Sequence, residues 1–354
     1  MMKKTLALLL SAIMMLAMLT ACGGKDSGSA PADTGSDSQQ NEPAPADTIP
    51  DAPEGGGTIG VCIYQFTDAF MTTYRNALQE ILEGKGYQVT TVDGANDQAK
   101  QNEQINTFIT QGVDALIINP VMTSAADQII ATVKAAGIPT VLINREPTAE
   151  QMAVYDKLVY VGALAAQSGT MQGELILDTA NQGDINGDGK ISYIMVQGDP
   201  ENIDAQLRTE YSVKALTDAG KEVEQLNLTR GDWMRERGQE IVANDLAQFG
   251  DQVEVVFCNN DDMAIGALQS IQAAGRKVNE DIYLVGVDAL DAALNEVQAG
   301  NMTGTVLNDA VGQATAAVEE MEKLLGGATY ASGEQSVYVD YVKVTPDNVG
   351  DFMK

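Results

Sequence analysis

From Thr58 onward, short apolar runs alternate with longer stretches of helical periodicity, and this alternation restricts the fold more than any other feature of the chain. The strand-like runs are Ile59–Phe66, Gln88–Val92, Asp114–Ile118, Thr140–Ile143, Ser192–Val196, Glu222–Leu228, Val253–Cys258, Ile282–Val287 and Gly304–Leu307. Helical patterns such as Phe70–Gly84, Gln101–Gly112 and Ala125–Gly137 separate them, and Gly ends each of these three. This order predicts βαβ units and parallel sheets. A break near 162–169 divides the series into two doubly wound α/β lobes.

Composition narrows the function as well as the fold. A length of 354 residues suits two domains, each with its own core. The chain has 50 acidic and 21 basic residues and a formal charge of −29, which argues against nucleic acid as a partner and against electrostatic attraction to anionic membranes. It contains no histidine, so Ser-His and Cys-His catalysis and the usual zinc sites are excluded. Carboxylate chemistry remains open to it.

The N-terminus predicts export and a lipid anchor. Lys3 and Lys4 precede an apolar run, Leu6–Leu19, that is too short for a stable membrane span, and small residues follow. This pattern is typical of a signal peptide over residues 1–21. Leu19-Thr20-Ala21-Cys22 resembles a bacterial lipobox, which implies cleavage before Cys22 and acylation of its thiol; an ordinary signal peptide with a stray cysteine is the alternative. Residues 22–57 are rich in Gly, Ser, Asp, Pro and Ala and predict a flexible acidic tether.

The segment Asp184–Ser192 matches the first nine positions of an EF-hand calcium loop. Oxygen-bearing side chains fall at positions 1, 3, 5 and 9, and Gly stands at position 6. The predicted ligands within the loop are Asp184, Asn186, Asp188, the carbonyl of Lys190, and Ser192. Met195 occupies position 12, where a bidentate Glu is expected, and the segment after the loop has a strand pattern. The last carboxylate must therefore come from elsewhere in the chain, unless the loop is a surface turn without metal.

Polar residues follow many of the predicted strands, at the positions where parallel sheets bind ligands. They are Asp68, Asn144, Asn202, Asp204, Arg208, Asn259, Asn260, Asp261, Asp288, Asn308 and Asp309. Each Asp or Asn taken alone could simply be a helix N-cap. Together, planar Asp, Asn and Arg groups offer the paired donors and acceptors that adjacent sugar hydroxyls require. Phe70 and the single tryptophan, Trp233, are candidates for walls against a pyranose ring, although Trp233 could instead pack on its own helix.

Several motifs in one order make residues 58–354 resemble the type I periplasmic sugar-binding proteins of ABC transport, and most closely their galactose/glucose-binding branch. The motifs are Ile63-Tyr64 with Asp68-Ala69-Phe70-Met71, Asn144-Arg145-Glu146-Pro147, the calcium loop, Asp204 with Arg208-Thr209, Asn259-Asn260-Asp261, Val287-Asp288-Ala289-Leu290 and Gly304–Ala310. The resemblance implies two α/β lobes joined by a three-stranded hinge. We expect the first lobe at 58–161 and 311–338, and the second, with the calcium loop, at 162–310 and 339–354.

Carried over position by position, the resemblance implies a hexose, galactose or glucose above all, bound in the cleft between the lobes. The implied sugar-binding residues are Asp68, Phe70, Asn144, Asn202, Asp204, Arg208, Trp233, Asn260, Asp288 and Asn308. Asn202 stands where the galactose/glucose-binding proteins have a histidine. The resemblance also implies that Glu254 supplies the missing ligand of a structural Ca²⁺ site.

The leading hypothesis is a monomeric, lipid-anchored extracytoplasmic protein that captures a hexose and delivers it to an ABC permease. The same pocket could instead report sugar to a chemoreceptor or sensor kinase. A carbohydrate-active enzyme using Asp68 and Asp204 is a third reading. We expect neighbouring amides and Arg208 to keep these carboxylates ionised, which favours binding over hydrolysis. A sugar-responsive transcription regulator is excluded by the signal sequence and the acidity. Cys62 and Cys258 lie in strand-like runs and are expected to be buried free thiols.

Overall fold

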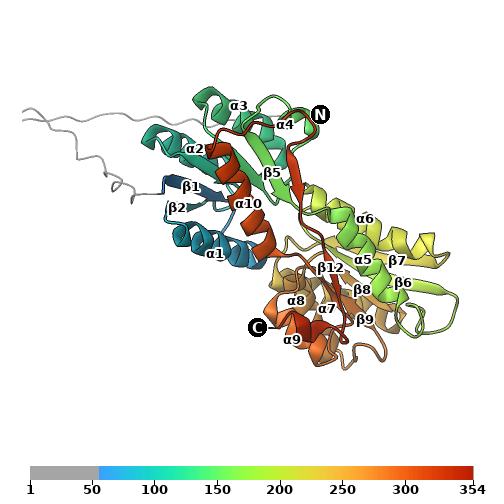
Figure 1. Cartoon of the computed structure of the whole chain (residues 1–354). Helices are drawn as coiled ribbons and strands as arrows, with labels where there is room; N and C mark the ends of the chain where they lie inside the picture. Colours follow the sequence, from blue (N-terminus) through green and yellow to red (C-terminus); the bar gives the residue numbers. More distant parts are fainter. Residues whose placement is uncertain (1–55, 354) are drawn as a thin grey trace, which may run out of the picture. The chain divides into compact units, whose positions relative to one another are not determined.

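The structure, a computed structural model, describes residues 56–353. Two parallel sheets with helices on both faces organise these residues (Figure 1). The first sheet has the strand order β11-β5-β4-β3-β1-β2. Its strands are β1 (Thr58–Ile63), β2 (Gln88–Asp93), β3 (Ala115–Ile118), β4 (Thr140–Ile143), β5 (Leu158–Gly162) and β11 (Ser336–Tyr338).

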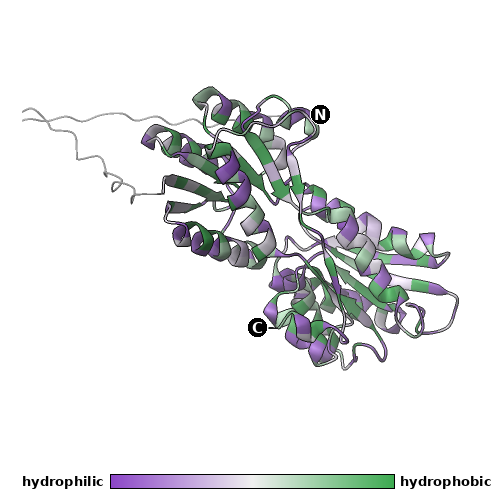
Figure 2. Cartoon of the chain, in the orientation of Figure 1, coloured by the Kyte–Doolittle hydropathy of each residue, from purple (hydrophilic) through white to green (hydrophobic). Residues whose placement is uncertain are grey.

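Four helices cover the first sheet, two on each face. Apolar side chains of α1 (Ala69–Gly84) and α10 (Ala310–Leu325) pack on one face. Those of α2 (Gln98–Gln111) and α3 (Ala126–Ala136) pack on the other. A short helix, α4 (Ala149–Met152), joins β4 to β5. Because both faces are covered, the central strands are apolar along their length rather than alternating (Figure 2).

The second sheet has the order β7-β6-β8-β9. Its strands are β6 (Lys190–Gln197), β7 (Glu222–Arg230), β8 (Val255–Cys258) and β9 (Tyr283–Val285). The helices α5 (Ala165–Leu177) and α6 (Ile203–Asp218) lie on one face. On the other lie α7 (Arg235–Phe249), α8 (Asp261–Ala273) and α9 (Asp291–Gln298). Parallel bridges join β10 (Thr305–Leu307) to the β9 side, and β12 (Val342–Val344) pairs antiparallel with β10. The α/β fold with parallel sheets in two lobes is therefore confirmed.

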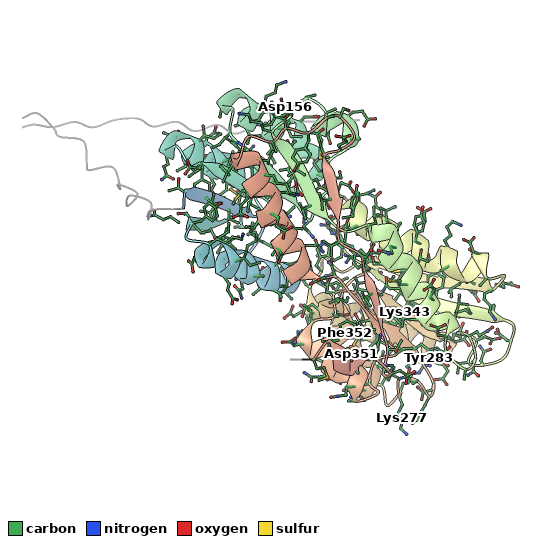
Figure 3. All side chains as sticks on the ribbon, in the orientation of Figure 1. Asp156, Lys277, Tyr283, Lys343, Asp351 and Phe352 are labelled. Carbon is green, nitrogen blue, oxygen red and sulfur yellow. The ribbon has the colours of Figure 1, made fainter. Side chains whose placement is uncertain are left out.

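The chain passes between the two sheets three times within residues 56–353: from β5 to α5, from β10 to α10, and from β11 to β12. After the third passage the C-terminal segment stays with the second sheet, where Figure 3 labels Lys343, Asp351 and Phe352. Phe352 packs against that lobe's core, and Lys343 pairs with Asp178. Three short connections between two lobes are the arrangement in which hinge-type domain motion occurs.

Two details of the strands bear on the sequence analysis. β5, with the sequence Leu-Val-Tyr-Val-Gly, is a fully buried strand that the sequence analysis did not predict. The segment after the calcium-like loop is indeed a strand, β6, and not an exit helix. Cys62 and Cys258 are buried free thiols, as predicted.

Candidate functional site

One cavity lies at the carboxyl ends of the strands and draws its walls from both lobes. Space free of protein atoms within it, the opening to solvent included, amounts to about 350 Å³. All ten residues predicted to contact a sugar line it, together with Tyr64, Met71 and Arg145. The lining is strongly polar and largely buried, so a ligand in it would lose most of its contact with water.

The first lobe contributes a wall built on the loops after β1 and β4. Asp68 caps α1: its Oδ1 accepts a hydrogen bond from the Met71 amide at 2.7 Å. Its Oδ2 accepts one from the Tyr64 hydroxyl, also at 2.7 Å. Asn144 has a φ of 63°, a left-handed conformation that Asn tolerates, and this brings the turn after β4 to the cavity. The Arg145 guanidinium stacks 4.2 Å from the centroid of the Tyr64 ring.

The second lobe contributes the start of α6. Asn202 caps this helix through its Oδ1, which accepts from the Asp204 amide at 2.9 Å. Asp204 and Arg208 are one helical turn apart and both face the cavity. Arg208 donates from Nη1 to the carbonyl of Asn259 at 2.9 Å and from Nη2 to the hydroxyl of Tyr341 at 3.0 Å. These two bonds fix the guanidinium before any ligand arrives.

Asp288, Asn308 and Asn260 complete the wall. Asp288 follows β9 with a φ of 123°, and Ala289 after it has a φ of 52°, so the turn is held in a conformation that L-residues rarely adopt. Asn308 donates from Nδ2 to Asp288 Oδ1 at 3.3 Å. Asn260 caps α8 through Oδ1 and donates from Nδ2 to the carbonyl of Trp233 at 3.3 Å. Capping a helix and binding a ligand are therefore compatible roles for one residue, since one polar atom can cap the helix while the side chain still lines the cavity.

Burial dominates the charge state of the three carboxyl groups. It raises the pKa of Asp204 to about 6, against the opposing effect of Arg208. Burial also raises the pKa of Asp68, and it raises that of Asp288 well above the usual range. The sequence analysis named the amides and Arg208 around Asp68 and Asp204 but left out this desolvation, which opposes the ionised form of both carboxyl groups.

Both cavity arginines have unused hydrogen-bonding capacity. The Nε atoms of Arg145 and Arg208 are buried and have no partner. Arg208 lies 3.9 Å from Asp204 Oδ2 and 4.0 Å from Asp288 Oδ1, too far for direct hydrogen bonds. Buried donors and acceptors left in this state are costly, and a ligand with several hydroxyl groups could satisfy them.

Two aromatic residues face the cavity from different lobes. Phe70 is buried on α1 and packs edge-on against Tyr74 at 6.0 Å between centroids. Trp233 precedes α7 with a φ of 65°, and its ring lies against Gly198, where a Cβ would come within 2.3 Å of it. Trp233 is therefore held by its surroundings rather than merely packed on its own helix. The pair can cover the apolar faces of a sugar ring.

Sequence reasoning missed four residues of this site. Three of them, Tyr64, Met71 and Arg145, line the cavity. They stand in the same sequence motifs as predicted site residues, so those motifs were a signal that could have identified them. Tyr341 orients Arg208 from the third connection between the lobes. No local pattern around Tyr341 indicates this role, because the contact joins segments 133 residues apart.

The calcium-like loop has the local turns that its sequence predicts. Asp184 accepts from the amides of Gly187 at 2.8 Å and Gly189 at 3.0 Å, and both glycines have positive φ. Asn186 Oδ1 accepts from the Asp188 amide at 2.8 Å, and Asp188 Oδ1 accepts from the Lys190 amide at 3.1 Å. The loop thus folds back on its own oxygen-bearing side chains.

Glu254 reaches this loop from the end of the segment before β8. Its Oε1 accepts from the amides of Ile185 and Asn186, and its Oε2 from that of Ser192. In the described part of the chain, no three His, Cys, Asp or Glu side chains are already grouped as metal ligands. The donor chemistry nevertheless fits a hard cation, because carboxylate, amide and carbonyl oxygens are what Ca²⁺ prefers.

Two predictions concern the N-terminal region. Cys22, its proposed lipidation and the signal peptide fall outside the described residues. Among residues 56–353, none of the helices has the length and apolar character needed to cross a membrane.

Comparison with known proteins gives the family. Residues 59–329 match the periplasmic binding protein domain. The D-galactose/methyl-galactoside binding periplasmic protein of Haemophilus influenzae is 37% identical over 309 residues, covering 84% of this chain and 92% of that protein. A xylitol-binding protein of Mycolicibacterium smegmatis is 27% identical, covering 82% and 78%. A solute-binding protein of Bacillus halodurans, solved with myo-inositol, is 29% identical with a TM-score of 0.73 and covers 86% of this chain and 99% of that one.

These relatives are transport binding proteins, which settles the enzyme alternative against catalysis despite the raised carboxyl pKa values. The chain belongs to the periplasmic binding proteins, in the extracytoplasmic sugar-binding group that serves ABC transporters.

Proposed function

We propose that this protein binds a hexose, galactose or glucose first, by closing its two lobes around the ring. The observation that carries the proposal is the cavity itself. Three buried carboxyl groups and two buried arginines line it, and the Nε atom of each arginine has no hydrogen-bond partner. A neutral ring with several hydroxyl groups can donate to the carboxylates and accept from the guanidinium groups at once.

The aromatic walls of the cavity support a pyranose ring as the ligand. Phe70 and Trp233 can cover the two apolar faces of that ring. The relative from Haemophilus influenzae, which its name describes as binding D-galactose and methyl-galactoside, supports galactose as the first candidate. Asn202 can still donate or accept at the cavity wall, so a polar contact there is retained.

A ligand screen tests this proposal directly. We expect D-galactose or D-glucose to raise the melting temperature of the protein and to titrate as one site by calorimetry, because a ligand that binds only the folded state stabilises it. Ribose, xylitol and myo-inositol serve as comparison ligands of different ring size or shape. Tighter binding of any of these than of both hexoses would contradict the hexose assignment.

We further propose that the protein is anchored to the outer surface of the cell membrane through a lipid on Cys22 and delivers its sugar to an ABC permease. The lipobox-like sequence and the tether composition of residues 22–57 support the anchor. Cys22→Ser should abolish incorporation of labelled fatty acid and release the protein from membranes in expressing cells. Cys62→Ser is the matched control, because that thiol is buried and unmodified. Equal labelling of the Cys22→Ser variant would refute the anchor.

We also propose that Asp184–Ser192 and Glu254 hold one Ca²⁺ ion with a structural role. Bound there, the ion would join the loop to the segment before β8 within one lobe. Glu254→Gln should lower the melting temperature, since three backbone amides lose a carboxylate partner. A chelator should lower the melting temperature of the unmodified protein but not that of Glu254→Gln, because the variant lacks the proposed Ca²⁺ ligand. Glu222→Gln, at the exposed start of β7, is the control. An unchanged chelator response in Glu254→Gln would exclude Glu254 as a ligand.

A further inference from the structure

Asn308 lies at the connection from β10 to α10 and is 4% exposed. Both polar atoms of its side chain are engaged. Nδ2 donates to Asp288 Oδ1 at 3.3 Å, and Oδ1 accepts from Gln313 Nε2 at 2.6 Å. The orientation of this amide decides whether the cavity meets a donor or an acceptor at this corner, because a half-turn of the group exchanges the two.

Gln313 stands behind the cavity wall. It lies in the first turns of α10, is 1% exposed, and is not among the residues that line the cavity. α10 packs on the first sheet, whereas Asp288 follows β9 of the second sheet. The short series Gln313–Asn308–Asp288 therefore joins the two lobes through the second of their three connections.

Contact with Asp288 alone does not fix which way the Asn308 amide is turned. An ionised Asp288 would accept from Nδ2, as observed. A protonated Asp288 would instead donate to Oδ1 of a reversed amide, and burial favours protonation by raising the pKa of Asp288. The Gln313 amide, as it is oriented in the structure, opposes this second arrangement, because its Nε2 donates to the Asn308 oxygen.

We propose that Gln313 is a positioning residue that fixes Asn308 as a donor and Asp288 as an acceptor toward the bound sugar. The inference rests on the proposed sugar-binding function. A group placed between an Asn308 amine and an Asp288 carboxylate must both accept and donate. A hydroxyl does both, whereas an ammonium, a carboxylate or a C–H group fails at one contact or both. This corner of the cavity therefore selects for one particular sugar hydroxyl.

Gln313→Glu tests the proposal, because its carboxylate accepts where the Gln amide donates. Asn308 then turns its amine toward the new carboxylate and its oxygen toward Asp288. We expect D-galactose affinity, or D-glucose affinity if that sugar binds more tightly, to fall about tenfold by calorimetry. In the unmodified protein, one monodeoxy analogue of that sugar should show the largest loss of affinity. In Gln313→Glu that loss should shrink by about tenfold, since the hydroxyl then meets two acceptors, the Asn308 oxygen and the Asp288 carboxylate, and can donate to only one of them.

Two further variants separate positioning from folding. Gln313→Met removes the donor without adding charge. The affinity loss of the most affected monodeoxy analogue should therefore shrink in this variant too, but by a smaller factor than in Gln313→Glu. Gln335→Glu alters another buried glutamine, whose Nε2 donates to the carbonyls of Met152, Tyr155 and Leu158. It should lower the melting temperature but leave the pattern of deoxy-sugar affinities unchanged. Unaltered deoxy-sugar selectivity in both Gln313 variants would overturn the proposal.

A measurement without ligand keeps this inference separate from the sugar assignment. The Asn308 side-chain amide protons should exchange slowly with solvent by NMR in the unmodified protein and at a changed rate and chemical shift in Gln313→Glu. If neither hexose binds but these signals change, the proposed ligand is wrong and the positioning of Asn308 by Gln313 stands. If the signals are the same in both proteins, the positioning role of Gln313 is refuted.

Discussion

At the residue scale, the site is organised around Arg208. Its guanidinium is tied to a backbone carbonyl and to Tyr341, yet it remains just beyond hydrogen-bonding distance of Asp204 and Asp288. The charges are therefore fixed in place with room for hydroxyl groups between them. Preorganisation of this kind lowers the cost of ordering side chains when a ligand binds.

Asp204→Asn should weaken hexose binding by about 10- to 100-fold, because a charge-assisted hydrogen bond to a sugar hydroxyl becomes a neutral one and Arg208 loses a partner. Calorimetric titration measures the change. Asp218→Asn, on the exposed end of the same helix, is the control and should bind normally. Normal affinity in Asp204→Asn would remove this residue from the site.

The ligand-free protein should become more stable as the pH falls from about 7.5 to 5.5. Asp204 has a folded-state pKa of about 6, above its value in the unfolded chain, so folding takes up a proton in this range. The cost of burying the charged carboxylate is full above that pKa and is relieved as the group protonates. Thermal melts across this range test the sign. The rise should be smaller in Asp204→Asn, and a fall in stability over this range would contradict the argument.

At the element scale, the placement of Trp233 depends on the backbone of a neighbouring strand end. Gly198 follows β6, and an added Cβ would lie 2.3 Å from the Trp233 ring. The turn between β7 and α7 can bring Trp233 to the cavity only because Gly198 leaves that space empty. Position 198 therefore controls one aromatic wall without contacting the ligand itself.

Gly198→Ala should move the Trp233 ring and reduce hexose affinity by about tenfold, through the loss of part of an aromatic contact. The intrinsic tryptophan fluorescence should shift as well, since the chain has a single tryptophan. Gly84→Ala is the control, because a Cβ there meets no atom within 4 Å and Ala favours the helix. Unchanged affinity and fluorescence in Gly198→Ala would show that the ring tolerates the methyl group.

At the scale of the whole molecule, three connections allow the lobes to close while the cavity draws ligand contacts from both. A sugar that touches both walls stabilises the closed arrangement by its differential contacts. Solution X-ray scattering should therefore show a smaller radius of gyration with saturating hexose than without. Asp204→Asn at the same sugar concentration should show less of the change. An identical radius with and without bound sugar would rule out hinge closure as the mode of capture.

Much of this architecture could be read from the sequence, because the cues are local. Alternation of strand and helix periods predicts parallel sheets, and such sheets gather the residues that follow their strands at one edge. For this reason the polar residues that follow the strands could be expected near one another. The set of ten sugar-binding residues, from Asp68 to Asn308, came from the resemblance to the sugar-binding family, and the structure brings all ten to one cavity. The turn geometry of Asp184–Ser192 was equally local.

Other features depended on tertiary structure, since they arise from segments distant in sequence or from depth of burial. β5, which the sequence analysis did not predict, pairs with β4 on one side and β11 on the other. The contacts of Tyr341 and Gln313 could not be predicted from the residues around them in the sequence. The raised pKa values of Asp68, Asp204 and Asp288 follow mainly from burial in the folded chain. The sequence by itself determined which chemical groups lie at the strand ends; only the tertiary structure decided how those groups are charged, oriented and held, because solvation and long-range contacts exist only in the folded chain.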